Sequence, residues 1–200
     1  MKRFAYLSCL SAACLLAATA PAAAHLPPGQ YGSFASGFSH PLFGLDHILA
    51  MVAVGLWASQ LGKRAMWIVP SAFVSVMILG FGMALVAVPL VFVEPMILAS
   101  VVVLGAMVAL AAKLDIRFCA AVVGLFALFH GHAHGGELGA AGALEFGAGF
   151  MLATALLHGA GVGLGIAAGR LGARIGGTGN VVSRVLGAAT AFAGIALAVA

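Results

Sequence analysis

Histidine and acidic side chains gather in two short segments of this 200-residue sequence. The first segment reads His-Pro-Leu-Phe-Gly-Leu-Asp-His and holds His40, Asp46 and His47. In a continuous helix the two histidines would fall about 20° short of two full turns apart, so they are predicted to share a face with Asp46 beside them. Two imidazoles and a carboxylate favour a divalent cation, because ionisable groups inside a membrane usually mark a substrate path. The alternatives are a neutral Asp46, or an Asp46–His47 ion pair that holds helices together.

The second segment reads Phe-His-Gly-His-Ala-His-Gly-Gly-Glu and holds His130, His132, His134 and Glu137. Alternating histidines in a glycine-broken segment are predicted to turn their imidazoles toward one centre. The three-residue step from His134 to Glu137 allows a shared ligand face if the chain is locally helical. Nitrogen and oxygen donors of this kind suit nickel, zinc, cobalt or copper. The alternative is an exposed loop that captures metal loosely.

Other polar residues are harder to assign from the sequence. Glu94 is predicted to attract cations at the outer mouth of the third apolar stretch, with a solvated loop residue as the alternative. His25, Glu145 and His158 have no assigned role. The three cysteines are too scattered for a disulfide framework or a Cys-x-x-Cys site. Metal chemistry in this chain must therefore use histidine and carboxylates.

The composition excludes several classes of protein. Hydrophobic residues make up 64% of the chain and charged residues 7%, whereas a soluble domain needs roughly 25% charged residues to cover its surface. Disorder is excluded by the same numbers. The nine basic residues stand singly or in pairs, so no nucleic-acid surface is predicted. No phosphate-binding glycine loop is present, and nucleotide binding is not expected.

The elements that position the polar segments are apolar helices. Six stretches have about the length that crosses the hydrocarbon of a bilayer, and they lack the alternation of a membrane barrel. We therefore predict an all-α, polytopic membrane helical bundle with about six transmembrane helices. Gly161, Gly165 and Gly169 recur every four residues, a spacing typical of close helix packing. The predicted spans are Phe43–Leu61, Met66–Val88, Met96–Ala112, Phe118–His132, Ala143–Ala168 and Val181–Ala200.

A leader precedes these spans. Residues 1–24 combine a basic start, an apolar run and a small-residue exit, which predicts a cleavable signal peptide followed by a single transmembrane domain over 25–200. The alternative is an uncleaved first span. Every Lys and Arg after the leader falls on one side of the predicted bundle, and this side should be cytoplasmic. We expect a bacterial inner-membrane protein whose mature amino and carboxyl termini are both periplasmic.

The two motifs together resemble those of the HupE/UreJ family of bacterial membrane proteins, and the resemblance covers essentially the whole chain. It implies an association with hydrogenase or urease systems and a role as a nickel permease. It also implies that six residues are functional and that nickel is the metal. These residues are His40, Asp46, His47, His130, His134 and Glu137.

The sequence therefore predicts a secondary permease, not an enzyme, that takes up a divalent metal from the periplasm for metalloenzyme assembly. Ni²⁺ follows from the resemblance alone, and Co²⁺, Zn²⁺ and Cu²⁺ stay open. No prosthetic group is expected, and the partners are the lipid bilayer and the ion, with a homo-oligomer left open. The alternative functions are a membrane-embedded zinc-dependent hydrolase and a non-transporting metal sensor or assembly factor.

Overall fold

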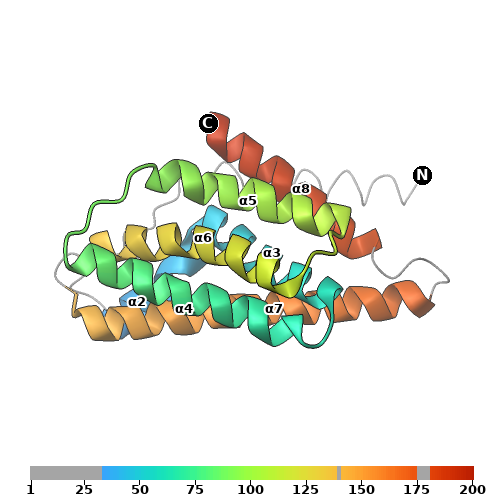
Figure 1. The fold of residues 1–200 in the computed structure, drawn as a ribbon, viewed down its shortest axis with the longest axis horizontal. Coiled ribbons are helices and arrows are strands. Elements are labelled where there is room, and N and C mark those ends of the chain that lie inside the picture. The colour runs from blue at the N-terminus through green and yellow to red at the C-terminus, as the bar shows by residue number, and fades with distance from the viewer. Residues whose placement is uncertain (1–32, 139–140, 175–180) are drawn as a thin grey trace, which may run out of the picture.

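The computed structural model describes residues 33–138, 141–174 and 181–200. The predicted signal peptide and His25 lie outside these residues. Within them every regular element is a helix, and the helices form one elongated bundle (Figure 1). The predicted all-α fold is confirmed.

Five helices are long and apolar enough to cross a membrane, and a bent pair of shorter helices is a candidate for a sixth, broken span. The span count was therefore predicted closely, but the first span is not one helix. The helices are α2 (Ser33–Phe43), α3 (Leu45–Leu61), α4 (Ala65–Leu85), α5 (Val93–Leu110), α6 (Ile116–Gly136), α7 (Ala143–Arg174) and α8 (Val181–Val199).

The break in the first span falls at Gly44, where the chain bends by 81° between α2 and α3. Gly44 has an extended backbone, and a Cβ at this position would lie 2.9 Å from both Asp46 Oδ1 and His47 Nδ1. Pro41 lies near the end of α2. The prediction that His40 and His47 share one face of one helix is therefore wrong.

Helix α3 is the centre of the bundle and contacts α2, α4, α5, α7 and α8. Its side chains supply much of the core, including Met51, Leu56 and Trp57, which are fully buried. Trp57 Nε1 also donates a 2.9 Å hydrogen bond to the carbonyl of Ala112, which joins α3 to the end of α5. The carboxyl-terminal part of α3 is thereby joined to the connection between α5 and α6.

Glycines let neighbouring helices approach until their backbones touch. A Cβ on Gly161 of α7 would meet the Val52 carbonyl of α3, and one on Gly165 would meet Ser59 Oγ. The predicted close packing along this glycine stripe is confirmed at both positions. Helices α4 and α6 touch in the same way, because a Cβ on Gly131 would meet the Met77 carbonyl. The position of α6 is therefore tied closely to that of α4.

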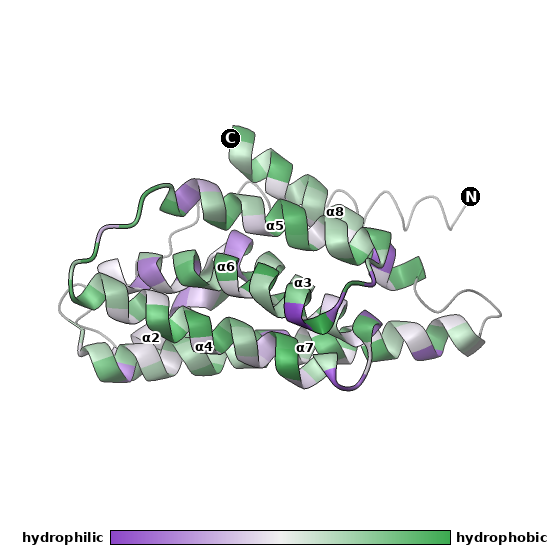
Figure 2. Ribbon diagram, viewed as in Figure 1, coloured by the Kyte–Doolittle hydropathy of each residue, from purple (hydrophilic) through white to green (hydrophobic). Residues whose placement is uncertain are grey.

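Charge is divided between the two ends of the bundle. The basic residues within the described ranges lie in the α3–α4 connection, around the start of α6, near the end of α7 and in the first turn of α8. In Figure 2 this end shows a concentration of hydrophilic residues around the α3–α4 and α5–α6 connections. The opposite end carries four of the five acidic residues of the chain, namely Asp46, Glu94, Glu137 and Glu145.

Candidate metal centre

The second histidine segment is the last part of helix α6, which continues through Gly136. The prediction of a glycine-broken segment is wrong, because the glycines serve close packing against α4 instead of ending the helix. His130 and His134 lie one turn apart and are both buried. His132 points elsewhere, and its Nε2 lies 2.8 Å from the carbonyl oxygen of Val88. A helix cannot turn all three imidazoles toward one centre.

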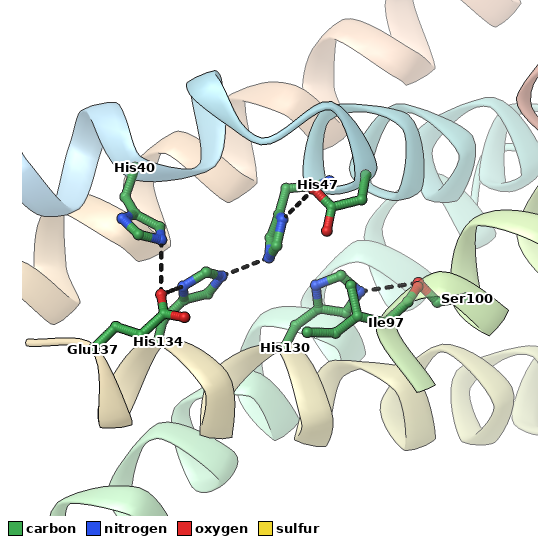
Figure 3. Close-up of polar contacts among 8 residues, drawn as sticks. His40, His47, Ile97, Ser100, His130, His134 and Glu137 are labelled. Carbon is green, nitrogen blue, oxygen red and sulfur yellow. Dashed lines mark hydrogen bonds and ion pairs between the residues drawn. The ribbon is translucent and has the colours of Figure 1, made fainter. Parts of the chain in front are cut away.

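Three side chains from two separate parts of the chain converge at the acidic end of the bundle (Figure 3). His40 Nε2 lies 3.1 Å from Glu137 Oε2, and His134 Nδ1 lies 3.3 Å from the same oxygen. One ligand atom from each residue falls within 4.8 Å of the others, close enough to hold one metal ion. We call His40, His134 and Glu137 the outer triad. Helix α2 supplies its first member and the end of α6 the other two.

A second row of contacts leads inward from the outer triad. His134 Nε2 lies 2.6 Å from His47 Nε2, and His47 Nδ1 lies 2.8 Å from Asp46 Oδ1. The same carboxylate oxygen accepts the backbone N–H of His47 at 2.9 Å. Glu137, His134, His47 and Asp46 thus form a continuous row of carboxylate, imidazole, imidazole and carboxylate.

Glu137 is the charged member of the outer triad. Hydrogen bonds from His134 and His40 hold the pKa of its carboxyl well below the usual range, although partial burial opposes this shift. Its side chain stays 41% exposed, so the triad is open to water on this side. Among the described residues, Asp46 and Glu137 form ion pairs with histidines only. No lysine or arginine in the described ranges pairs with either carboxylate.

His130 occupies a different environment, one turn further along α6. It is fully buried, and its Nε2 lies 3.0 Å from Ser100 Oγ of α5. The Ser100 hydroxyl donates its own proton to the Ile97 carbonyl at 2.6 Å, so it accepts from His130. His130 is therefore protonated on Nε2, and the lone pair of Nδ1 has no hydrogen-bond partner among the described residues.

Aromatic rings wall the site on its inner side. Phe150 lies against His134, with ring centroids 4.4 Å apart. Phe73 separates two histidines, at 5.7 Å from His130 and 5.0 Å from His158. His158 is buried and has no hydrogen-bond partner among the described residues. These rings lower the local dielectric and strengthen the attraction between the carboxylates and a cation.

The structure brings together six of the eight side chains predicted to bind metal and leaves His132 and Glu94 apart. Glu94 lies exposed in the first turn of α5. Ser100 was not predicted, although it is the only hydrogen-bonding side chain in the apolar stretch 96–112. That isolation was the signal that could have identified it. The six that come together are His40, Asp46, His47, His130, His134 and Glu137.

Comparisons with known proteins show the family of the chain. A model of the HupE / UreJ protein family matches residues 13–197. The chain belongs to the HupE/UreJ family. A curated member, Protein HupE of Rhizobium leguminosarum bv. viciae, is 48% identical over 188 residues, which cover 92% of this chain and 95% of the relative. No solved structure matches the chain. The resemblance seen in the two motifs is thereby confirmed for this HupE/UreJ protein.

Proposed function

We propose that this HupE/UreJ protein is a secondary permease that takes up Ni²⁺ from the periplasm for the assembly of hydrogenase or urease. The observation that carries this proposal is the outer triad, in which two imidazoles and a carboxylate from separate helices converge. Within the described part of the chain no lysine or arginine pairs with this carboxylate. Such donors suit divalent nickel, cobalt, zinc and copper. The choice of nickel among them rests on the family.

The distribution of charge supports the direction of transport. Basic residues accumulate on the cytoplasmic side of membrane proteins, so the acidic end that holds the outer triad faces the periplasm. In this orientation the chain lies in the inner membrane with its carboxyl terminus outside. An ion that approaches from the periplasm meets Glu137 first, because its carboxylate is the exposed member of the outer triad.

His47 contacts His134 of the outer triad, and Asp46 contacts His47, so the two residues orient the His134 ring. When His134 binds metal through Nδ1, its Nε2 carries the proton and donates to His47 Nε2. His47 then carries its proton on Nδ1 and donates to Asp46. A ligating histidine whose second nitrogen donates to a further polar group is held in one tautomer and becomes a better ligand.

Flux measurements test this proposal most directly. Purified protein in liposomes should admit radioactive nickel, and Asp46→Asn or His40→Ala should lower the initial rate at least about tenfold at equal protein content. A zinc hydrolase or a non-transporting sensor would use the same ligands to bind metal but would not move it. Absence of nickel flux through the unmodified protein, or full flux through both variants, would contradict the proposal.

Metal binding should also release protons. Without metal, the three contacts Glu137–His134, His134–His47 and His47–Asp46 need one proton each. An ion between Glu137 and His134 replaces the first of these protons, because a ligating nitrogen must be unprotonated. Calorimetric titration with Ni²⁺ in buffers of different ionisation enthalpy should show a release of about one proton per ion. Binding heats that do not depend on the buffer would exclude this row of protons.

A further inference from the structure

We infer that the cavity between α4 and α7 binds a quinone, a membrane-soluble ring with oxygen atoms at opposite edges and an apolar tail. This inference goes beyond the proposed function, because it concerns another part of the bundle and involves no metal. Helices α4 and α7 pack against each other along one side of the bundle (Figure 1). The cavity between them has a volume of about 610 Å³, which is typical of sites for small organic ligands.

His158 of α7 is the polar side chain that points to a ligand. It is 1% exposed, it lines the cavity, and neither of its ring nitrogens has a hydrogen-bond partner among the described residues. A neutral imidazole offers one N–H donor and one lone pair, and leaving these buried and unpaired costs free energy. A ligand oxygen in the cavity satisfies His158, because a carbonyl accepts its N–H and a hydroxyl donates to its lone pair.

The depth of the polar groups selects the class of ligand. His158 is the sixteenth of the 32 residues of α7, and Ser75, which also lines the cavity, is the eleventh of the 21 residues of α4. Both lie near the middle of helices long enough to cross the membrane, about 15 Å from either surface of a hydrocarbon layer about 30 Å thick. Phospholipid headgroups stay at those surfaces. A neutral molecule that dissolves in the hydrocarbon brings its oxygen atoms to this depth at a much lower cost than a charged one.

The polar groups lie on both walls of an otherwise apolar cavity. Helix α7 contributes His158, and α4 contributes the hydroxyls of Ser71 and Ser75, one turn apart. A fatty alcohol has a single oxygen and satisfies one wall, whereas a quinone has a carbonyl at each edge of its ring and accepts from both. The indole of Trp67 is also part of the lining and offers an aromatic surface to the ring. The other lining side chains are mainly aliphatic and suit an apolar tail.

Tryptophan fluorescence measures this binding in the absence of nickel. Decylubiquinone, a quinone with an alkyl tail, should quench the emission of the detergent-solubilised protein along a saturable curve, because Trp67 lines the cavity. Gly159 also lines the cavity, and a Cβ there has no neighbour within 4 Å. Gly159→Leu therefore adds a side chain to the cavity without a clash at Cβ, and it should weaken saturable quenching at least about tenfold.

Gly163→Leu is the matched control, one turn further along α7. A Cβ on Gly163 also has no neighbour within 4 Å, but Gly163 is not part of the described lining. Its quenching curve should match that of the unmodified protein, and decanol should not displace the quinone. The inference is overturned if the two leucine variants behave alike, if decanol competes equally, or if the unmodified protein shows no saturable quenching. Loss of self-association in Gly159→Leu without quinone binding would assign the cavity to a second copy of the chain.

His158→Leu separates binding from folding. Without quinone its thermal unfolding midpoint should equal or exceed that of the unmodified protein, because the substitution removes a buried unpaired group. Its affinity for decylubiquinone should fall at least about tenfold, since the hydrogen bond from the ring is lost. A lower midpoint with unchanged affinity would make His158 a packing residue and overturn the inference. If this variant does not fold, the comparison of Gly159→Leu with Gly163→Leu still decides.

Discussion

Replacing His134 with alanine should reduce nickel uptake to the level of protein-free liposomes, a loss of at least about 100-fold. His134 is the one imidazole that contacts both Glu137 and His47. Its removal takes a ligand from the outer triad and disconnects Asp46 from it. Loss of a single supporting contact of a metal ligand typically costs 10- to 100-fold in affinity, and here a ligand and its support are lost together.

His132→Ala is the matched control for this variant. His132 lies on the same helix, two residues away, but its ring points to the Val88 carbonyl instead of the outer triad. Uptake by this variant should stay within about twofold of the unmodified protein, as expected for a group that is not a metal ligand. Equal losses for His132→Ala and His134→Ala would mean that helix α6 as a whole, and not the outer triad, had been disturbed.

The second large effect, on stability and nickel affinity, is expected from Gly80→Ala, although Gly80 has no side chain that could bind metal. A Cβ at this position would meet the backbone carbonyl of Leu128 and would lie 3.0 Å from the backbone nitrogen of His132. Backbone atoms cannot rotate away, so α4 and α6 must separate. Overpacking of this kind costs about 1–3 kcal/mol or more. Both the thermal unfolding midpoint in detergent and the affinity for Ni²⁺ should fall, because α6 carries His130 and His134.

Gly82→Ala provides the comparison within the same helix. A Cβ on Gly82 has no neighbour within 4 Å among the described residues. Alanine is also the better helix former, by up to about 1 kcal/mol. This variant should unfold at the same or a higher temperature and should bind nickel normally. If Gly80→Ala and Gly82→Ala behaved alike, close packing of α4 on α6 would not be what positions the histidines.

The membrane bundle could be predicted from the sequence because apolar length is a local property. The bend at Gly44 could not, since the residues around it are apolar enough to continue a helix. Gly44 and Pro41 are both compatible with a helix start, and only contacts with the rest of the bundle decide otherwise. Close packing at Gly161 and Gly165 could be predicted because glycines at four-residue spacing are typical of helix interfaces in lipid. That α3 is the partner helix could not be predicted.

The candidate metal centre was predictable by residue type but not by geometry. The histidine and carboxylate clusters predicted eight side chains, and six of these lie together at one end of the bundle. The different contacts of the three histidines of the second segment depend on helix α6. This helix directs His132 toward the Val88 carbonyl and His130 toward Ser100. Such partners come from helices distant in sequence, so no local spacing reveals them.

The bend between α2 and α3 has a mechanical consequence. Because the first span is broken, α2 is a separate arm, joined to α3 by one extended residue and packed along α7 through Gly37 and Gly149. His40 lies on α2, whereas His47 and His134 lie on α3 and α6 in the core of the bundle. A tilt of α2 together with the adjoining turns of α7 would change the number of ligands around an ion without disturbing the row from His134 to Asp46. The number of ligands around a bound ion would then depend on the tilt of α2, with no change in the chemistry of any ligand.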